Sequence, residues 1–237
     1  MVDQNSPFYG LEVKDNPVLE VSAQEHTLQQ ELEQHLQHFN ALPENCDALE
    51  KARLKLDIAE CYLGLDQPED AHKWTQQTFQ IFMQNSEWQL AVDCCDIIYN
   101  CNKKDALIAL GNGIWLAVTF PIDPNTSIQM LHHIVDETPD DSDGAAVAAM
   151  LAHFLAETRS NEQEHKNLTF LTNQIIAQVA KRHRGISDAN AIQTWIKMYE
   201  LDDIQKLLPK MGVILDAIVA GKWWYDRDQI RKQLPVN

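Results

Sequence analysis

Basic residues are scarce in this sequence of 237 residues. Its 19 Lys and Arg stand against 35 Asp and Glu, which gives a formal net charge of −16. A field of this sign repels the phosphate groups of nucleic acids and of anionic lipids. We therefore expect neither a nucleic acid nor a membrane as a partner.

Glycine is scarce as well, and so are the motifs that depend on it. The chain has 8 glycines, and neither GxxxxGK(S/T) nor GxGxxG occurs, so no loop that cradles a nucleotide phosphate is predicted. Long hydrophobic runs are also missing. The most apolar stretch, 106–122, is interrupted by two glycines and a proline and is shorter than the roughly 20 residues that a membrane-spanning helix requires.

The start of the chain lacks the features of an export signal. Residues 1–16 carry three acidic residues and no apolar core, so we expect a flexible segment rather than a secretory or mitochondrial leader. The five cysteines are an odd number, and Cys94 is adjacent to Cys95, which makes an ordinary disulfide awkward. Reduced cysteines are typical of the cytoplasm, which is the compartment we expect.

The apolar residues that are present follow a helical period, and no sustained alternation indicates a strand. Leu49, Ala52, Leu56, Ala59 and Leu63 form one such stripe, as expected for one face of an amphipathic helix. The sequence therefore predicts an all-α protein. We expect ten helices and a short terminal one, over 22–40, 47–64, 68–84, 87–101, 103–119, 126–136, 143–158, 161–183, 188–199, 202–220 and 226–233.

Five sequences that fit or approach the capping box precede helical stretches. In a capping box, a Ser, Thr or Asp oxygen accepts from an early backbone N–H, and a Glu or Gln three residues later reaches back. This pattern predicts helix starts at Ser22, Asp47, Ser86, Thr126 and Ser160.

A degraded repeat with an offset of 35 residues aligns Leu56–Ala71 with Ala91–Ala106. It pairs Asp70-Ala71 with Asp105-Ala106, and Tyr62 precedes Ala71 by nine residues. Region 47–119 thereby resembles the tetratricopeptide (TPR) repeat family, whose period is about 34 residues. The usual tryptophan near the repeat start is missing. The resemblance implies antiparallel helix pairs stacked on their neighbours and a groove that binds a peptide or protein, but it transfers no binding residue.

These patterns suggest how the chain is organised. After the segment 1–16, we expect an N-terminal TPR-like helical region over 17–119. A C-terminal helical region over 120–237 is expected to pack on it as one domain. The architecture is then a short TPR-like α-solenoid or a multi-helix bundle.

Two groups of residues are candidates for partner binding. The acidic run that contains Asp136, Asp140 and Asp141 forms either a helix-capping loop or a docking patch for a basic partner. The aromatic run Trp223-Trp224-Tyr225 is of the type enriched in binding hot spots. The alternative is that these rings close the open end of the helical stack.

A metal site is the other candidate. Glu69–His72 and Glu162–His165 each have the Glu-x-x-His spacing that presents two ligands on one face of a helix in di-iron bundles. A shared site requires the two motifs to face each other in the core. Otherwise we expect no metal and no cofactor.

Two functional hypotheses follow. The first is a non-catalytic interaction, scaffold or assembly factor that holds another polypeptide in a helical groove or on an acidic surface. Its partner is expected to be basic or amphipathic, or another copy of the same chain. The alternative is a metal-dependent helical-bundle enzyme that uses the Glu-x-x-His ligands.

Overall fold

The computed structural model describes residues 17–232 and 234, with side chains from Glu25 onward. The segment 1–16, for which we expect flexibility, lies outside the described residues. The described part is all-helical and contains no strand, which confirms the predicted fold class. Its helices are α1 (Pro17–Ala41), α2 (Ala48–Gly64), α3 (Pro68–Thr75), α4 (Thr78–Gln84), α5 (Trp88–Asn100), α6 (Ala106–Thr119), α7 (Pro124–Glu137), α8 (Asp143–Arg159), α9 (Glu162–Arg184), α10 (Ala189–Met198), α11 (Ile204–Val219) and α12 (Arg227–Arg231).

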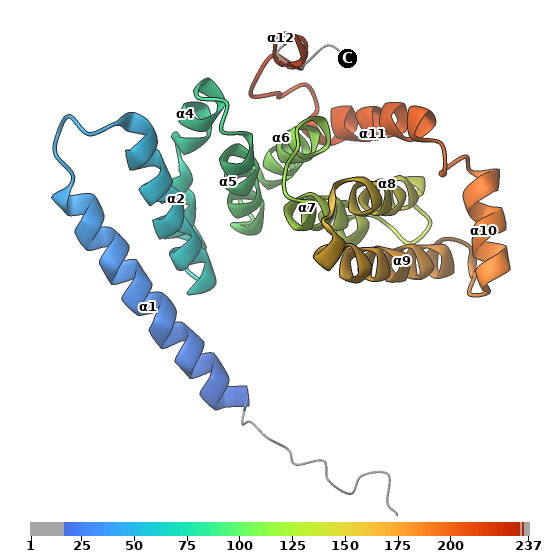
Figure 1. The fold of residues 1–237 in the computed structure, drawn as a ribbon, viewed down its shortest axis with the longest axis horizontal. Coiled ribbons are helices and arrows are strands. Elements are labelled where there is room, and N and C mark those ends of the chain that lie inside the picture. The colour runs from blue at the N-terminus through green and yellow to red at the C-terminus, as the bar shows by residue number, and fades with distance from the viewer. Residues whose placement is uncertain (1–16, 233, 235–237) are drawn as a thin grey trace, which may run out of the picture.

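Helices adjacent in the chain pack against each other and follow one another along an arch (Figure 1). Helix α2 packs on α3 and α4, α5 on α6, and α7 on α8. The first helix of each pair also contacts the first helix of the next, in the order α2, α5, α7 and α9. This arrangement is compatible with a helical repeat, in which stacked neighbours bury a continuous core.

The centre of the array depends on small residues that allow close approach of helices. Helices α6 and α8 each contribute ten buried residues. A Cβ at Gly113 in α6 would lie 2.4 Å from Met130 Cε on α7 and 2.6 Å from Cys95 Cβ on α5. Only glycine fits at this crossing, because real Cβ atoms do not approach other atoms so closely.

The C-terminal part of the chain turns back over the array. Helix α11 packs on α6 and α8 and is followed by Ala220 and Gly221, both with positive φ. The next residues return to α6, where the fully buried Asn112 accepts a hydrogen bond from Trp224 N at 3.0 Å. The hydroxyl of Tyr225 donates to Asn112 O at 2.6 Å. The chain end thus satisfies a buried polar side chain that would otherwise be costly.

The prediction of one long helix over 68–84 is wrong, because the structure divides this segment into α3 and α4. Gln77 adopts a left-handed conformation with φ of 72°. The hydroxyls of Thr75 and Thr78 bond to nearby carbonyls, with Thr78 Oγ1 donating to Thr75 O at 2.7 Å. The break turns Phe79 and Phe82 into the core, so burial of two rings offsets the strained residue.

The predicted helix starts are confirmed at one position and shifted at the others. Asp47 caps α2 by accepting from Glu50 N at 3.2 Å. The cap of α7 is Asp123 rather than Thr126, and the cap of α9 is Asn161 rather than Ser160. Asp and Asn cap as well as Ser and Thr do. The starts predicted at two further residues are also wrong, since α1 runs through Ser22 and α5 begins after Glu87 without a side-chain cap at Ser86.

The remaining predictions from composition concern membranes and disulfides. Among the described residues, none of the helices combines the length and apolar character that a bilayer crossing demands. All five cysteines are unpaired, and only Cys46 is partly exposed.

Candidate partner-binding site

Carboxylates gather on the first helices of three consecutive pairs, α2, α5 and α7, which succeed one another along the array (Figure 1). Helical repeat proteins often use the surface formed by such equivalent helices for binding. We call this set of residues the acidic strip: Asp57 and Glu60 on α2, Asp93 and Asp96 on α5, and Asp136 and Glu137 on α7.

Polar contacts between α5 and α7 join the strip residues of these two helices. Asp96 accepts from Gln129 Nε2 at 3.1 Å and faces His133 Nε2 at 3.0 Å, so both of its oxygens bond to α7. The Tyr99 hydroxyl on α5 donates to Glu137 Oε1 at 2.8 Å. These bonds position the carboxylates across helix boundaries rather than leaving them on independent surfaces.

Burial and mutual repulsion raise the pKa of two carboxylates of the strip. Burial, reinforced by the negative charges of Asp93, Asp57 and Asp96, raises the pKa of Glu60 to about 7. Burial also raises the pKa of Asp93 to about 6, although a hydrogen bond from Gln89 opposes the change. Raised values of this kind mean that the charged forms cost free energy in the folded chain.

Few positively charged side chains of the described residues lie near enough to these carboxylates to stabilise their ionised forms. Of the described Lys and Arg residues, none lowers the pKa of Glu60 or Asp93. Within the described part of the chain, Glu60 has neither a hydrogen-bond partner nor an ion-pair partner. Arg53 lies near Asp57 but already pairs with Glu87 at 2.6 Å. A cluster of carboxylates with raised pKa values is a candidate functional surface.

The acidic residues predicted from sequence lie at one end of this strip. Asp136 belongs to it and pairs with His132 at 3.4 Å. Asp140 and Asp141 follow in the exposed loop between α7 and α8. The loop also caps α8, since Ser142 Oγ accepts from Gly144 N at 3.1 Å. The helix-capping interpretation therefore holds for Ser142, whereas the binding of Asp136, Asp140 and Asp141 to a partner stays a prediction.

The basic end of α9 anchors this loop. Arg182 Nη2 donates to Val135 O at 2.6 Å, at the end of α7. His183, whose side chain is fully buried, lies 2.9 Å from Asp143 Oδ1. These contacts hold the loop in place while leaving Asp140 and Asp141 exposed.

The predicted aromatic run lies elsewhere, over α4 and α6. Trp224 and Tyr225 pack against Phe79, with ring centroids 5.1 and 6.1 Å apart, respectively. The guanidinium of Arg227 lies 3.9 Å from the ring centroid of Trp223. All three aromatic residues are half-buried by contacts within the chain. Their binding to a partner stays a prediction.

The structure does not bring the two Glu-x-x-His motifs together. They lie on α3 and α9, which do not pack against each other. Glu69 pairs with Lys103 at 2.5 Å, and His72 Nε2 lies 3.3 Å from Asp105. Glu162 is exposed in the first turn of α9, and His165 lies 3.8 Å from Glu157. In the described ranges, no three His, Cys, Asp or Glu residues are arranged to hold a metal ion.

Sequence reasoning missed Asp57, Glu60, Asp93 and Asp96. One signal could have found them, because Asp57 and Glu60 recur as Asp93 and Asp96 at an offset of 36 residues. That offset is one residue longer than the offset of the apolar repeat. Acidic pairs that recur at nearly the period of a helical repeat indicate a surface shared by successive repeats.

Comparisons with known protein families, with curated proteins and with solved structures find no match for this chain.

Proposed function

We propose that the protein is a non-catalytic interaction or assembly factor that binds a basic polypeptide segment along the acidic strip. The observation that carries this proposal is the placement of six carboxylates on the successive helices α2, α5 and α7, with Asp96 of α5 bonded to α7. Burial raises the pKa of Glu60 and Asp93 among them, and the charges that act on these two include no Lys or Arg of the described residues. A bound cationic side chain supplies the missing charge and lowers the cost of ionising both carboxylates. The free energy that the unbound protein spends on ionising Glu60 and Asp93 is therefore partly recovered when a cationic partner binds.

The dimensions of the strip define the segment that fits. Packed helices lie roughly 8–10 Å apart, so the steps from α2 to α5 and from α5 to α7 span roughly 20 Å. An extended chain covers that distance with about six residues. A short Lys- and Arg-rich segment matches both the length and the charge.

The resemblance to TPR repeats supports the same function. We infer that α2 with α3, and α5 with α6, are degenerate repeats, because the aligned Ala71 and Ala106 are both buried where the second helix packs. The first helices of such pairs form the surface that carries the strip. The unpaired cysteines support a cytoplasmic location.

A labelled oligolysine peptide tests the proposal, with an oligoglutamate peptide as the charge-reversed probe. In fluorescence anisotropy, we expect oligolysine to bind and oligoglutamate not to bind. We also expect the binding of oligolysine to weaken as the salt concentration rises. The double variant Glu60→Gln, Asp93→Asn should bind about tenfold more weakly, since each lost ionic contact is worth up to about 1 kcal/mol.

A matched control separates the strip from net charge. The double variant Glu44→Gln, Asp66→Asn removes the same two charges at exposed positions in loops, and Asn tolerates the positive φ at position 66. We expect it to bind oligolysine almost as tightly as the unaltered protein. Equal losses in the two double variants contradict a localised site and leave only general attraction to an acidic protein.

A further inference from the structure

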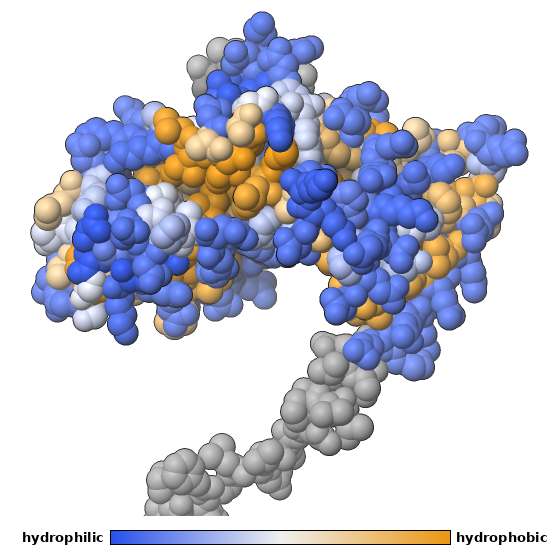
Figure 2. Space-filling view, turned by 180° about the vertical axis from the view of Figure 1, so that it is seen from behind, coloured by the Kyte–Doolittle hydropathy of each residue, from blue (hydrophilic) through white to orange (hydrophobic). Residues whose placement is uncertain are grey.

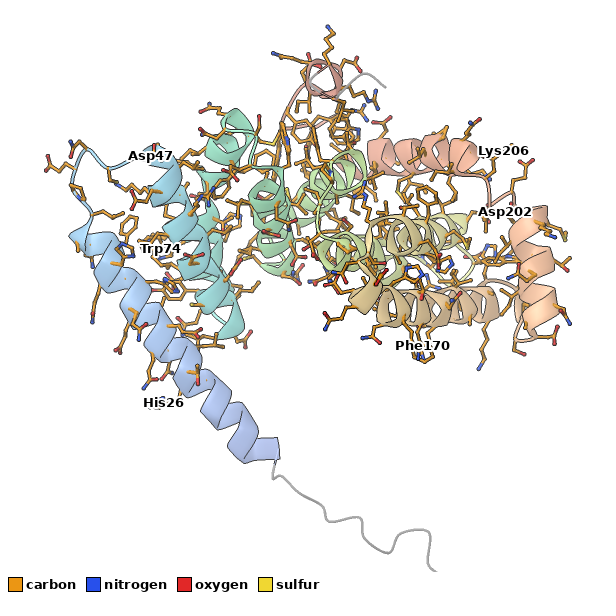
Figure 3. All side chains as sticks on the ribbon, viewed as in Figure 1. His26, Asp47, Trp74, Phe170, Asp202 and Lys206 are labelled. Atoms are coloured by element: carbon orange, nitrogen blue, oxygen red, sulfur yellow. The ribbon has the colours of Figure 1, made fainter. Side chains whose placement is uncertain are left out.

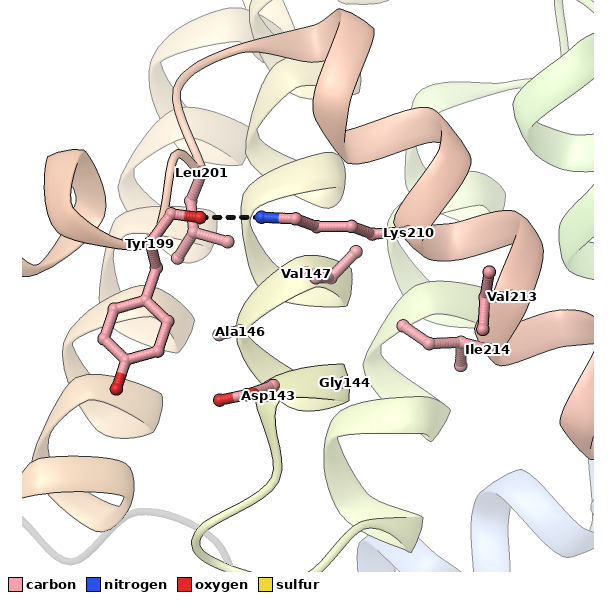
Figure 4. A pocket seen from close by; sticks show the side chains of 9 residues that line it. All are labelled: Asp143, Gly144, Ala146, Val147, Tyr199, Leu201, Lys210, Val213 and Ile214. Atoms are coloured by element: carbon pink, nitrogen blue, oxygen red, sulfur yellow. Dashed lines mark hydrogen bonds between the residues drawn. The ribbon is translucent and has the colours of Figure 1, made fainter.

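The far end of the array presents an apolar surface around Tyr199. Met198 on α10 and Val213 on α11 are 75% and 71% exposed. Tyr199 lies between them, since it lines two neighbouring clefts. One cleft, of about 330 Å³, is formed with Val147, Leu201, Val213 and Ile214 (Figure 4). The other, of about 590 Å³, is formed with Ile186, Ala191, Trp195 and Met198. We call this surface the Tyr199 face.

The Tyr199 face is formed in advance of any contact. Lys210 Nζ donates to Tyr199 O at 2.7 Å, a bond that crosses the smaller cleft (Figure 4). Arg184 Nε donates to the Tyr199 hydroxyl at 3.0 Å. Because both ends of this residue are held, the ring that separates the clefts keeps one orientation. Docking of a partner here therefore costs little conformational entropy, because the surface is already ordered.

The position of the face in the array leaves it uncovered. Each earlier helix is packed against the next pair, but α11 turns away from α10 and packs on α6 and α8 (Figure 1). Seen from behind, hydrophobic side chains gather over α11 (Figure 2). Terminal helices of soluble arrays ordinarily present a polar outer side. Exposed Met198 and Val213 depart from that rule.

The charges around the face are nearly balanced, unlike those of the chain as a whole, because Asp143, which lines the smaller cleft, adds one acidic residue to an otherwise even set. Two copies of a chain with net charge −16 repel each other over most of their surface. Residues 184–213 carry four basic and four acidic residues, and Asp202 and Lys206 lie beside the turn between α10 and α11 (Figure 3). The eight are Arg184, Asp188, Lys197, Glu200, Asp202, Asp203, Lys206 and Lys210.

We propose that a second copy of this chain docks on the Tyr199 face and forms a twofold-symmetric dimer. A twofold contact pairs a surface with itself, so a surface that bears both signs can be complementary to its own copy. Met198 of each copy fills a cleft beside Tyr199 of the other, and methionine suits this role because its side chain adapts to irregular gaps. The dimer does not depend on the acidic strip.

Sedimentation velocity across a range of protein concentrations tests the proposal. We expect a dimer in the unaltered protein and a monomer in the variants Met198→Glu and Val213→Glu, because each places a charge in an apolar contact. The matched control is Phe170→Glu on α9, which introduces the same charge at a side chain that is 65% exposed (Figure 3). It should remain a dimer, and circular dichroism should show the same helix content in all variants.

Two results overturn the proposal: an unaltered protein that stays monomeric at every concentration, and a dimer that survives both Met198→Glu and Val213→Glu. High salt distinguishes this proposal from the binding of a basic segment. The apolar dimer contact should persist in salt, whereas oligolysine binding should weaken. Each proposal can therefore fail without the other.

Discussion

The substitution Glu60→Gln should stabilise the protein at alkaline pH. Burial and neighbouring carboxylates raise the pKa of Glu60 from 4.5 to about 7. As pH rises through this interval, the unfolded chain releases its proton first, so the folded state loses stability until the pH exceeds about 7. Glutamine has nearly the same shape and no charge, and it removes this cost.

The magnitude follows from the size of the pKa change. A rise from 4.5 to about 7 corresponds to about 3.4 kcal/mol at about 1.36 kcal/mol per unit. Glu60 keeps substantial contact with solvent, which screens its interactions, so we expect about 1 kcal/mol at pH 8. That gain corresponds to an increase of about 2–4 °C in the midpoint of thermal unfolding for a chain of this size.

Urea unfolding followed by circular dichroism measures the effect. At pH 8 the variant should require more urea than the unaltered protein, and at pH 4 the two curves should coincide because the carboxyl is protonated in both states. Glu44→Gln, in the exposed loop before α2, should change neither curve. A gain that is the same at both pH values, or a loss at pH 8, refutes the electrostatic reasoning.

Four further predictions concern packing, hydrogen bonding and thiol reactivity. Gly113→Ala should destabilise the fold by about 1–3 kcal/mol, since its new methyl group collides with α5 and α7. Gly212→Ala has no atom within 4 Å of its new methyl group and should be neutral or stabilising by up to about 1 kcal/mol in the same urea assay. Tyr225→Phe should cost about 0.5–1.5 kcal/mol by removing the hydroxyl that donates a second hydrogen bond to the Asn112 carbonyl. In a thiol-titration assay, Cys46 alone should react rapidly in the folded protein, because burial raises the pKa of Cys94 to about 12 and shields the other three.

Much of the fold could be predicted from the sequence, because a helical period and a short loop are local properties. The predicted stripe from Leu49 to Leu63 indeed forms α2. The break at Gln77 could not be predicted, because glutamine carries no preference for a left-handed conformation. The burial of Phe79 and Phe82 favours that break, and burial depends on the rest of the structure.

The candidate site could be predicted only at its C-terminal end. Asp136 attracts attention because other acidic residues follow it closely in the sequence. Glu60 and Asp96 are 36 residues apart and become neighbours only when α2 packs on α5. The perturbation of their ionisation comes from that packing, which no local pattern of residues reveals.

The return of Trp224 and Tyr225 to Asn112 joins residues more than 110 positions apart in the chain. During synthesis, Asn112 leaves the ribosome long before these two aromatic residues are made. Until then α6 has neither its covering helix nor the donor for the side-chain oxygen of Asn112. We therefore expect nascent chains that stop short of residue 220 to engage chaperones and to be degraded more readily than a chain that includes Trp224 and Tyr225.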